Sequence, residues 1–254
     1  MDGTASNYSA LCSDFYVIQK LGLKLEAPEG RENALEFFDR VRKTFPRLAN
    51  FQRTEGEVSL ESNSGEREWQ WTALRPMSVR SGHVNPASMA DEYQFHRAVL
   101  EIAPYFLSIS PLNIAMLEIV LGFDFETELD KDSVVFDALL AQSPLAGLID
   151  PGFAQTGFER VSEAQPALAI TMGERGDMQA VFEVRTRPAV PSPADRGDDP
   201  ISVLLTVRKF GPLGSLDELK AAFGAVVGHA EMLAEQRVIP NLVMPIHDTL
   251  QSRG

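Results

Sequence analysis

The sequence is poor in the features that mark secreted and membrane proteins. Its one cysteine, Cys12, cannot form an internal disulfide, the bond typical of oxidising compartments. No apolar run approaches the roughly 18–20 residues needed to span a bilayer. Residues 1–14 lack the cationic start and apolar stretch of a signal peptide. We therefore expect a soluble, cytoplasmic protein that does not associate with membranes.

Common signatures of catalysis and cofactor binding are also missing. The sequence contains no Gly-x-x-x-x-Gly-Lys-Ser/Thr or Gly-x-Gly-x-x-Gly segment to bind phosphates, and no Gly-x-Ser-x-Gly segment to present a nucleophile. Its four histidines are scattered, without a His-x-x-x-His pair that could hold a metal. We therefore predict no catalytic residue and no cofactor. This favours a non-enzymatic protein, although dispersed residues can also assemble an active site.

Acidic residues outnumber basic ones and give a net charge of −13. Nucleic acid is an unsuitable partner, because neutralising phosphates requires a clustered positive surface. Residues 1–112 carry 12 basic and 15 acidic side chains, net −3, whereas residues 113–254 carry 11 and 21, net −10. A basic segment at 39–53 is interpreted as helix. Solubility is the simplest explanation of the acidity; alternatively, the two halves present different surfaces to partners.

The two halves share one order of short motifs. A strand with Leu-Gly (19–26 and 118–126) precedes a helix, a hairpin with Gly-Glu-Arg in its turn, a strand opening with Pro-x-Ser-Val, and a second helix with Asp-Glu in its first turn. Apolar alternation predicts the strands, three-and-four spacing the helices, and Ser88 and Ser215 their N-caps. The shared order predicts an internal duplication in which Gly22 and Gly122 are equivalent.

We therefore predict an α+β fold built as a tandem duplication of a β-α-β-β-β-α unit, with antiparallel sheets and helices packed on one face. The predicted parts are a flexible N-terminus (1–13), a first repeat (14–112), a second repeat (113–236) and a C-terminal tail (237–254). This topology resembles the duplicated architecture of TATA-binding protein and its relatives. The resemblance covers topology alone, and the acidic charge argues against DNA binding.

Three segments carry a second resemblance: ALEFFDRVRKTFPRL, AMLEIVLGFDFE and ISVLLTVRKF with the following SLDEL. They are similar to a sporadically distributed family of uncharacterised bacterial proteins of about this length. The resemblance implies a helix ending in Phe-Pro, a mid-chain strand, and a late apolar strand followed by a helix. The central segment departs from the family, with LGFDF where an Arg-Tyr-Asn-like ending is expected. The resemblance implies no activity.

One predicted strand carries both tryptophans of the chain. Alternation places Trp69 and Trp71 on one face, with Arg75 and Arg80 nearby in sequence. Packing beneath the helices would make the tryptophans core residues. If their face is open instead, paired indoles with arginines suit a protein segment or an aromatic ligand.

Other candidates are a histidine and a row of acids. His96 lies on the apolar stripe of a helix, which favours a hydrogen-bonded core or groove histidine over a metal ligand or base. Asp124, Glu126 and Glu128 alternate, so an extended strand would align them for Ca²⁺ or Mg²⁺. The EF-hand pattern is absent, and a solvated strand end is the simpler interpretation. We predict no metal site and keep these three acids only as weak candidates.

Two functions are consistent with these features. The first is a non-enzymatic protein-interaction module, a homodimer that holds a protein partner on an exposed sheet or on its C-terminal segment. The apolar stripe of residues 238–250, interrupted by Pro240 and Pro245, must pack on its own core or on a neighbour. The alternative is a small-molecule-binding protein or enzyme. Its cleft would lie between sheet and helices and be lined by His96, Trp69, Trp71 and Arg75.

Overall fold

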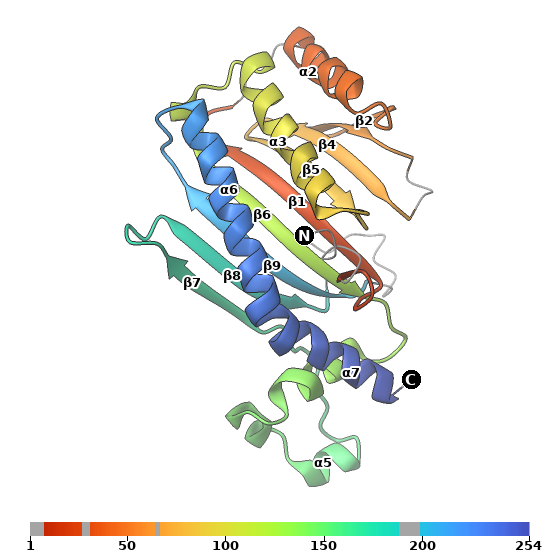
Figure 1. Cartoon of the computed structure of the whole chain (residues 1–254). Coiled ribbons are helices and arrows are strands. Elements are labelled where there is room, and N and C mark those ends of the chain that lie inside the picture. Colours follow the sequence, from red (N-terminus) through yellow and green to blue (C-terminus); the bar gives the residue numbers. More distant parts are fainter. Residues whose placement is uncertain (1–7, 27–30, 64–66, 188–198, 254) are drawn as a thin grey trace.

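A single antiparallel sheet organises the protein. The computed structural model describes residues 8–26, 31–63, 67–187 and 199–253. In these residues nine strands follow the order β2-β3-β4-β5-β1-β6-β9-β8-β7 (Figure 1). The predicted α+β class is therefore confirmed. The strands are β1 (Asp14–Leu23), β2 (Asn50–Thr54), β3 (Glu57–Glu61), β4 (Trp69–Arg75), β5 (Ser78–Val84), β6 (Ile114–Phe125), β7 (Ala167–Met172), β8 (Met178–Arg185) and β9 (Ile201–Phe210).

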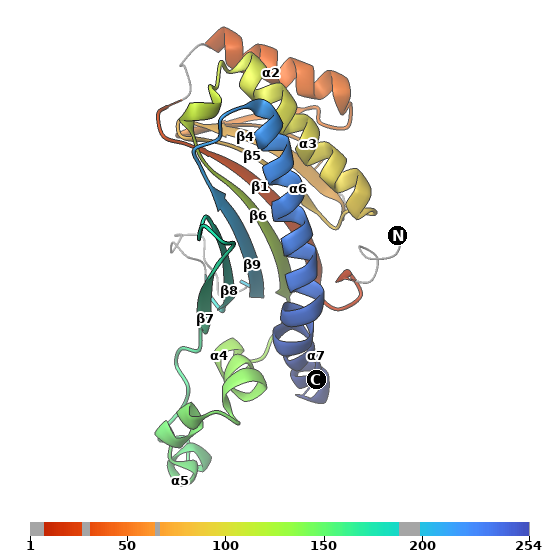
Figure 2. The same cartoon turned by 60° about the vertical axis from the view of Figure 1, so that its left-hand side comes forward.

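Helices cover only one face of this sheet. Helices α2 (Arg31–Thr44), α3 (Met89–Phe106) and α6 (Leu216–Leu233) lie on the same side, and Figure 2 shows the strands bowed toward them, with the opposite face concave. The alternation of β1 reflects the two environments: Phe15 and Val17 are fully buried under the helices, whereas Tyr16 and Ile18 are half-buried on the concave face. The main hydrophobic core therefore lies between sheet and helices.

The two central strands pair in a symmetric register. Tyr16 lies opposite Gly122, Met116 lies opposite Gly22, and Gln19 lies opposite Ile119. Tyr16 and Met116 are 100 residues apart in the sequence, and so are Gly22 and Gly122. A shift of 100 residues therefore converts the pair Tyr16–Gly122 into the pair Met116–Gly22. The pairing of β1 with β6 is therefore symmetric about Gln19 and Ile119.

Both long helices begin at the predicted caps. The Ser88 and Ser215 hydroxyls accept hydrogen bonds from the backbone N–H groups of Asp91 (3.4 Å) and Glu218 (3.1 Å). First-turn acids follow each cap, where the helix dipole favours negative charge. The N-terminal ends of these helices are therefore set by local chemistry that the sequence displays.

The C-terminal tail continues α6 and packs on the protein itself. A π-helical segment (Ala234–Val243) and α7 (Met244–Arg253) follow α6 directly. Pro240 lies in the π-helical segment, whose wider turn accommodates a residue without an N–H. The side chains of Val238, Val243 and Ile246 are fully buried. Of the two alternatives for the apolar stripe, the structure therefore supports packing on its own core.

The helix predicted through residues 39–53 is shorter than expected. Helix α2 ends at Thr44, and residues 50–54 form the edge strand β2, which pairs with β3. Pro46 has no N–H to continue the helix, and its ring disfavours the helical conformation at Phe45. The first half therefore contains one strand more than the predicted β-α-β-β-β-α unit.

Between β6 and β7 the chain forms a lobe that projects beyond the end of the sheet (Figures 1 and 2). It contains α4 (Lys131–Val135), a π-helical turn (Phe136–Leu140), a 3₁₀ turn (Pro144–Leu148) and α5 (Pro151–Gln155); another 3₁₀ turn, Pro111–Asn113, precedes β6. Asp132 anchors the lobe, because its Oδ1 accepts hydrogen bonds from Ala164 N–H and the Thr186 hydroxyl, each at 2.8 Å.

The N-terminal segment is described in part. Residues 1–7 of the predicted flexible segment lie outside the described residues. Tyr8, in contrast, is buried, and its ring centroid lies 5.2 Å from that of Phe15 and 5.9 Å from that of Phe123. Residues from Tyr8 onward therefore contribute to the packing of the central strands.

Candidate functional site

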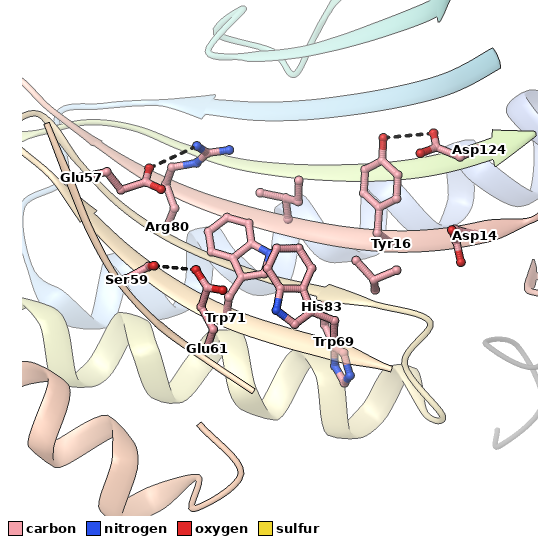
Figure 3. Close-up of a pocket in the computed structure, with 12 residues that line it drawn as sticks. Asp14, Tyr16, Glu57, Ser59, Glu61, Trp69, Trp71, Arg80, His83 and Asp124 are labelled. Atoms are coloured by element: carbon pink, nitrogen blue, oxygen red, sulfur yellow. Dashed lines mark hydrogen bonds and ion pairs between the residues drawn. The ribbon is translucent and has the colours of Figure 1, made fainter. Parts of the chain in front are cut away.

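A cavity of about 540 Å³ opens on the concave face of the sheet (Figure 3). Five strands supply its walls, namely β3, β4, β5, β1 and β6, which are neighbours in the sheet. The lining residues are Asp14, Tyr16, Ile18, Glu57, Ser59, Glu61, Trp69, Trp71, Arg80, His83, Val84 and Asp124.

The two tryptophans form one wall of this cavity. Their ring centroids are 6.2 Å apart and their planes are inclined by 36°, and both side chains are half-buried. The guanidinium of Arg80 lies over the Trp71 ring, 5.3 Å from its centroid, a distance at which a cation is attracted to the indole. The interpretation of the tryptophans as core residues beneath the helices is wrong, because their strand directs them to the concave face.

Glycines on neighbouring strands allow two aromatic rings to lie close to the sheet. Gly82 is opposite Trp71, and a Cβ atom on it would come within 2.4 Å of the indole. Gly122 is opposite Tyr16, and a Cβ atom there would come within 2.2 Å of the phenol ring. Because these two positions have no side chain, the Trp71 and Tyr16 rings can pack directly on the backbone of the neighbouring strand.

The far end of the cavity contains the carboxylates of Asp14 and Asp124, each of which accepts a hydrogen bond from a neutral donor. Asp124 accepts a hydrogen bond from the Tyr16 hydroxyl at 3.3 Å, and Asp14 accepts one from the Asn85 amide at 2.5 Å. Burial, followed by the negative charges of Asp14 and Glu126, raises the pKa of Asp124 to about 6 despite hydrogen bonds that lower it. This carboxyl group therefore changes its charge just below neutral pH.

At the opposite end of the cavity lie Arg75 and Arg80. Glu57 forms an ion pair with Arg75 and approaches Arg80 at 3.9 Å. Burial and the charge of Arg75 lower the pKa of Arg80, since a second positive charge nearby is unfavourable. Glu61 accepts a hydrogen bond from the Ser59 hydroxyl at 2.6 Å. Arginine and carboxylate side chains therefore border the tryptophans.

Behind the cavity, a buried polar network joins β1 and β5 to α3. Glu92 is fully buried, contacts His96 Nε2, and is hydrogen-bonded to His83 Nδ1. His96 Nδ1 lies 2.7 Å from the Ser81 hydroxyl, which donates to Gln19 Oε1 at 2.9 Å. These contacts connect the buried polar groups, although Gln19 Nε2, Glu92 Oε1 and His96 Nε2 have no hydrogen-bond partner of good geometry.

The network contains serine, histidine and glutamate, the residue types of a hydrolytic triad. However, Ser81, His96 and Glu92 are all 0% exposed, so no substrate atom can reach the serine hydroxyl. Ser81 and His96 therefore act as structural polar groups in this conformation.

The structure brings together some of the predicted site residues. Trp69, Trp71, Arg80 and Asp124 line the cavity, and Arg75 lies beside it through its ion pair with Glu57. His96 lies in the core on the other side of the sheet, so the cleft predicted between sheet and helices does not form around it. Strand β6 ends at Phe125, so Glu126 and Glu128 do not continue a row with Asp124.

Sequence reasoning missed Asp14, Tyr16, Glu57 and Glu61. Asp14 and Tyr16 alternate with the buried Phe15 and Val17 on β1, whereas burial does not alternate around Glu57 and Glu61 on β3. Alternation does not indicate, however, which strands are neighbours in the sheet.

In the described part of the chain, no group of three or more histidine, cysteine, aspartate or glutamate side chains is arranged to hold a metal ion. No helix there is long and apolar enough to cross a membrane. No protein-family model matches the sequence, and no curated protein is detectably similar to it.

Proposed function

We propose that the protein is a non-enzymatic interaction module that holds a segment of a partner protein on its concave sheet face. The observation that carries this proposal is the pair of half-buried tryptophans in an uncovered cavity. Large amphipathic aromatic side chains supply much of the binding energy where they contact a partner. The cavity also contains the acidic side chains that argue against a nucleic-acid ligand.

Affinity isolation from native cells, with quantitative mass spectrometry, tests this proposal. The W69A/W71A variant should lose the partner captured by the wild-type protein and melt within a few degrees of it. The matched control is F153A/F158A, which removes an aromatic pair with ring centroids 5.2 Å apart in the projecting lobe. The proposal is wrong if the tryptophan variant unfolds, or if the control alone loses the partner.

A small-molecule ligand, or an enzymatic activity on one, is the second candidate function. The cavity volume favours it, because pockets for small ligands measure about 300–1,000 Å³ and this cavity measures about 540 Å³. Native mass spectrometry of the isolated protein distinguishes the two functions. A bound small molecule that the W69A/W71A variant loses would favour the second, and a bound polypeptide would favour the first.

We further propose that the protein forms a homodimer through the edge strand β7. This strand pairs only with β8 within the sheet, is largely exposed, and presents Leu168 at 61% exposure. An apolar sheet edge of this kind is a site for pairing with another chain. Light scattering should show a dimer that L168K weakens, whereas F51K on the opposite edge strand should not. A 28.0 kDa monomer across micromolar concentrations would exclude the dimer.

The symmetric register also supports an internal duplication. Gly22 and Gly122 each lie opposite a large side chain of the other half, Met116 and Tyr16. We infer that residues 14–112 and 113–236 descend from one unit, with β2 gained by the first half. A homologous chain with two more similar halves, aligned with Gly22 on Gly122, would support the duplication; one in which these glycines align elsewhere would contradict it.

A further inference from the structure

The cavity on the concave face has an excess of negative charge. Its lining contains one guanidinium, that of Arg80. Glu57 is the carboxylate paired with arginine there. The remaining carboxylates accept hydrogen bonds from neutral donors, namely Glu61 from Ser59, Asp14 from Asn85 and Asp124 from Tyr16.

The aromatic wall already holds a cation. Arg80 lies over the Trp71 ring at 5.3 Å, and the adjacent Trp69 ring adds a second indole to the same wall. Indole rings attract ammonium and guanidinium groups through the negative potential of their faces. The indole rings and the carboxylates without an ion-pair partner therefore both favour a ligand with ammonium or guanidinium groups.

The two unpaired acidic regions lie far apart across the sheet. Across the sheet, Glu61 pairs with Trp71, Trp71 with Gly82, and Gly82 with Ile18 of β1. Glu61 is therefore three strand spacings, about 14 Å, from β1. Asp14 lies four residues, about 13 Å, along β1 from Ile18. The diagonal is roughly 19 Å, which an extended peptide covers in about six residues.

We propose that the cavity binds an extended protein segment with two basic side chains about six residues apart, one near Glu61 and one near Asp14 and Asp124. This inference rests on the proposed function and names the chemistry of its partner. The peptide crosses the tryptophan wall between its two basic residues, so that apolar contact and charge pairing act on the same segment.

Isothermal titration calorimetry with synthetic peptides tests the assignment. The probes are a peptide with two lysines separated by five serine, glycine and threonine residues, the same peptide with adjacent lysines, its diglutamate counterpart, and spermine. The spaced dilysine peptide should bind most tightly. Stronger binding of the diglutamate peptide, or of spermine, would overturn the assignment to a basic protein segment.

Substitutions on the protein give the second arm of the test. E61Q and D14N should each weaken binding of the spaced peptide by about two- to fivefold, as expected for exposed ion pairs. R80A should tighten it, because this change removes a competing cation from the Trp71 face. E36Q, an exposed glutamate of α2 on the helix-covered side of the sheet, is the control. Unchanged affinity in E61Q and D14N, or weaker binding in R80A, contradicts the inference.

This test can fail separately from the proposed function. If W69A/W71A loses a natural partner while E61Q and D14N retain it, the partner is held by the tryptophans without charge recognition. The interaction module then stands and the basic segment is wrong. If the tryptophan variant retains the partner, both proposals fail.

Discussion

Replacing Glu92 with glutamine should destabilise the protein strongly and in a pH-dependent way. Glu92 lies between His83 and His96 and is 0% exposed. Removing one partner of a buried charged pair typically costs about 3–5 kcal/mol, because the remaining groups stay buried without compensation. For a chain of this size each kcal/mol lowers the melting temperature by about 2–4 °C. E92Q should therefore melt roughly 10 °C below the wild-type protein.

The pH dependence follows from two opposite pKa shifts. Burial raises the pKa of Glu92, but the charge of His96 and the hydrogen bond from His83 outweigh it and lower the pKa. Burial lowers the pKa of His83, but the hydrogen bond and charges of Glu92 and Glu68 raise it overall. The Glu92 contribution is lost as pH falls through its lowered pKa, and the His83 contribution as pH rises through its raised pKa.

Both contributions are fully present between the ordinary pKa values, about 4.5 for glutamate and 6.5 for histidine. Urea denaturation from pH 4.5 to 9 should show the largest difference between wild type and E92Q in that window. The control is E68Q, because Glu68 contacts His83 but its side chain is 31% exposed. A loss below about 1 kcal/mol in E92Q, or one independent of pH, would refute the reasoning.

Three further predictions concern other parts of the structure. G82A should cost about 1–3 kcal/mol and shift tryptophan emission, because its Cβ would displace the Trp71 ring; an unchanged spectrum and denaturation midpoint would exclude this. Truncation before Val238 should lower helical content and stability, since the deleted residues 238–253 pack on the core; full stability by circular dichroism would contradict this packing. Binding of a cationic peptide should weaken as pH falls through about 6, where Asp124 becomes protonated, and D124N should remove that step in a calorimetric titration.

Local features of the fold could be predicted because local chemistry determines them. The serine caps at Ser88 and Ser215 depend on neighbouring residues alone, and the structure confirms them. The strand predicted at 19–26 is confirmed only in part, because β1 covers Asp14–Leu23 and Leu25, beyond its end, is 70% exposed. Helix α2 ends at Thr44, directly before Phe45 and Pro46, which agrees with the expected helix ending in Phe-Pro; the helical interpretation of 39–53 is wrong beyond that point, because Pro46 cannot extend a helix.

The site could be predicted only in part, because its assembly depends on strand order and register. Alternation places Trp69 and Trp71 on the same side of a strand but does not indicate which side the helices cover. Tyr16 and Asp124 meet across a distance of 108 residues in the chain, through the pairing of β1 with β6. The sequence predicts His96 in the same cleft as the tryptophans, yet the side of the sheet on which α3 packs directs it into the core.

Nuclear magnetic resonance of the tryptophan indole N–H groups tests the central claim most directly. The chain contains two tryptophans, so the spectrum should contain two indole signals, one from each wall residue. Both signals should shift on titration with the natural partner segment, or with the spaced dilysine peptide, and the shifts should saturate with the affinity measured by calorimetry. If the ligand binds while both indole signals stay unchanged, the concave cavity is not the recognition surface.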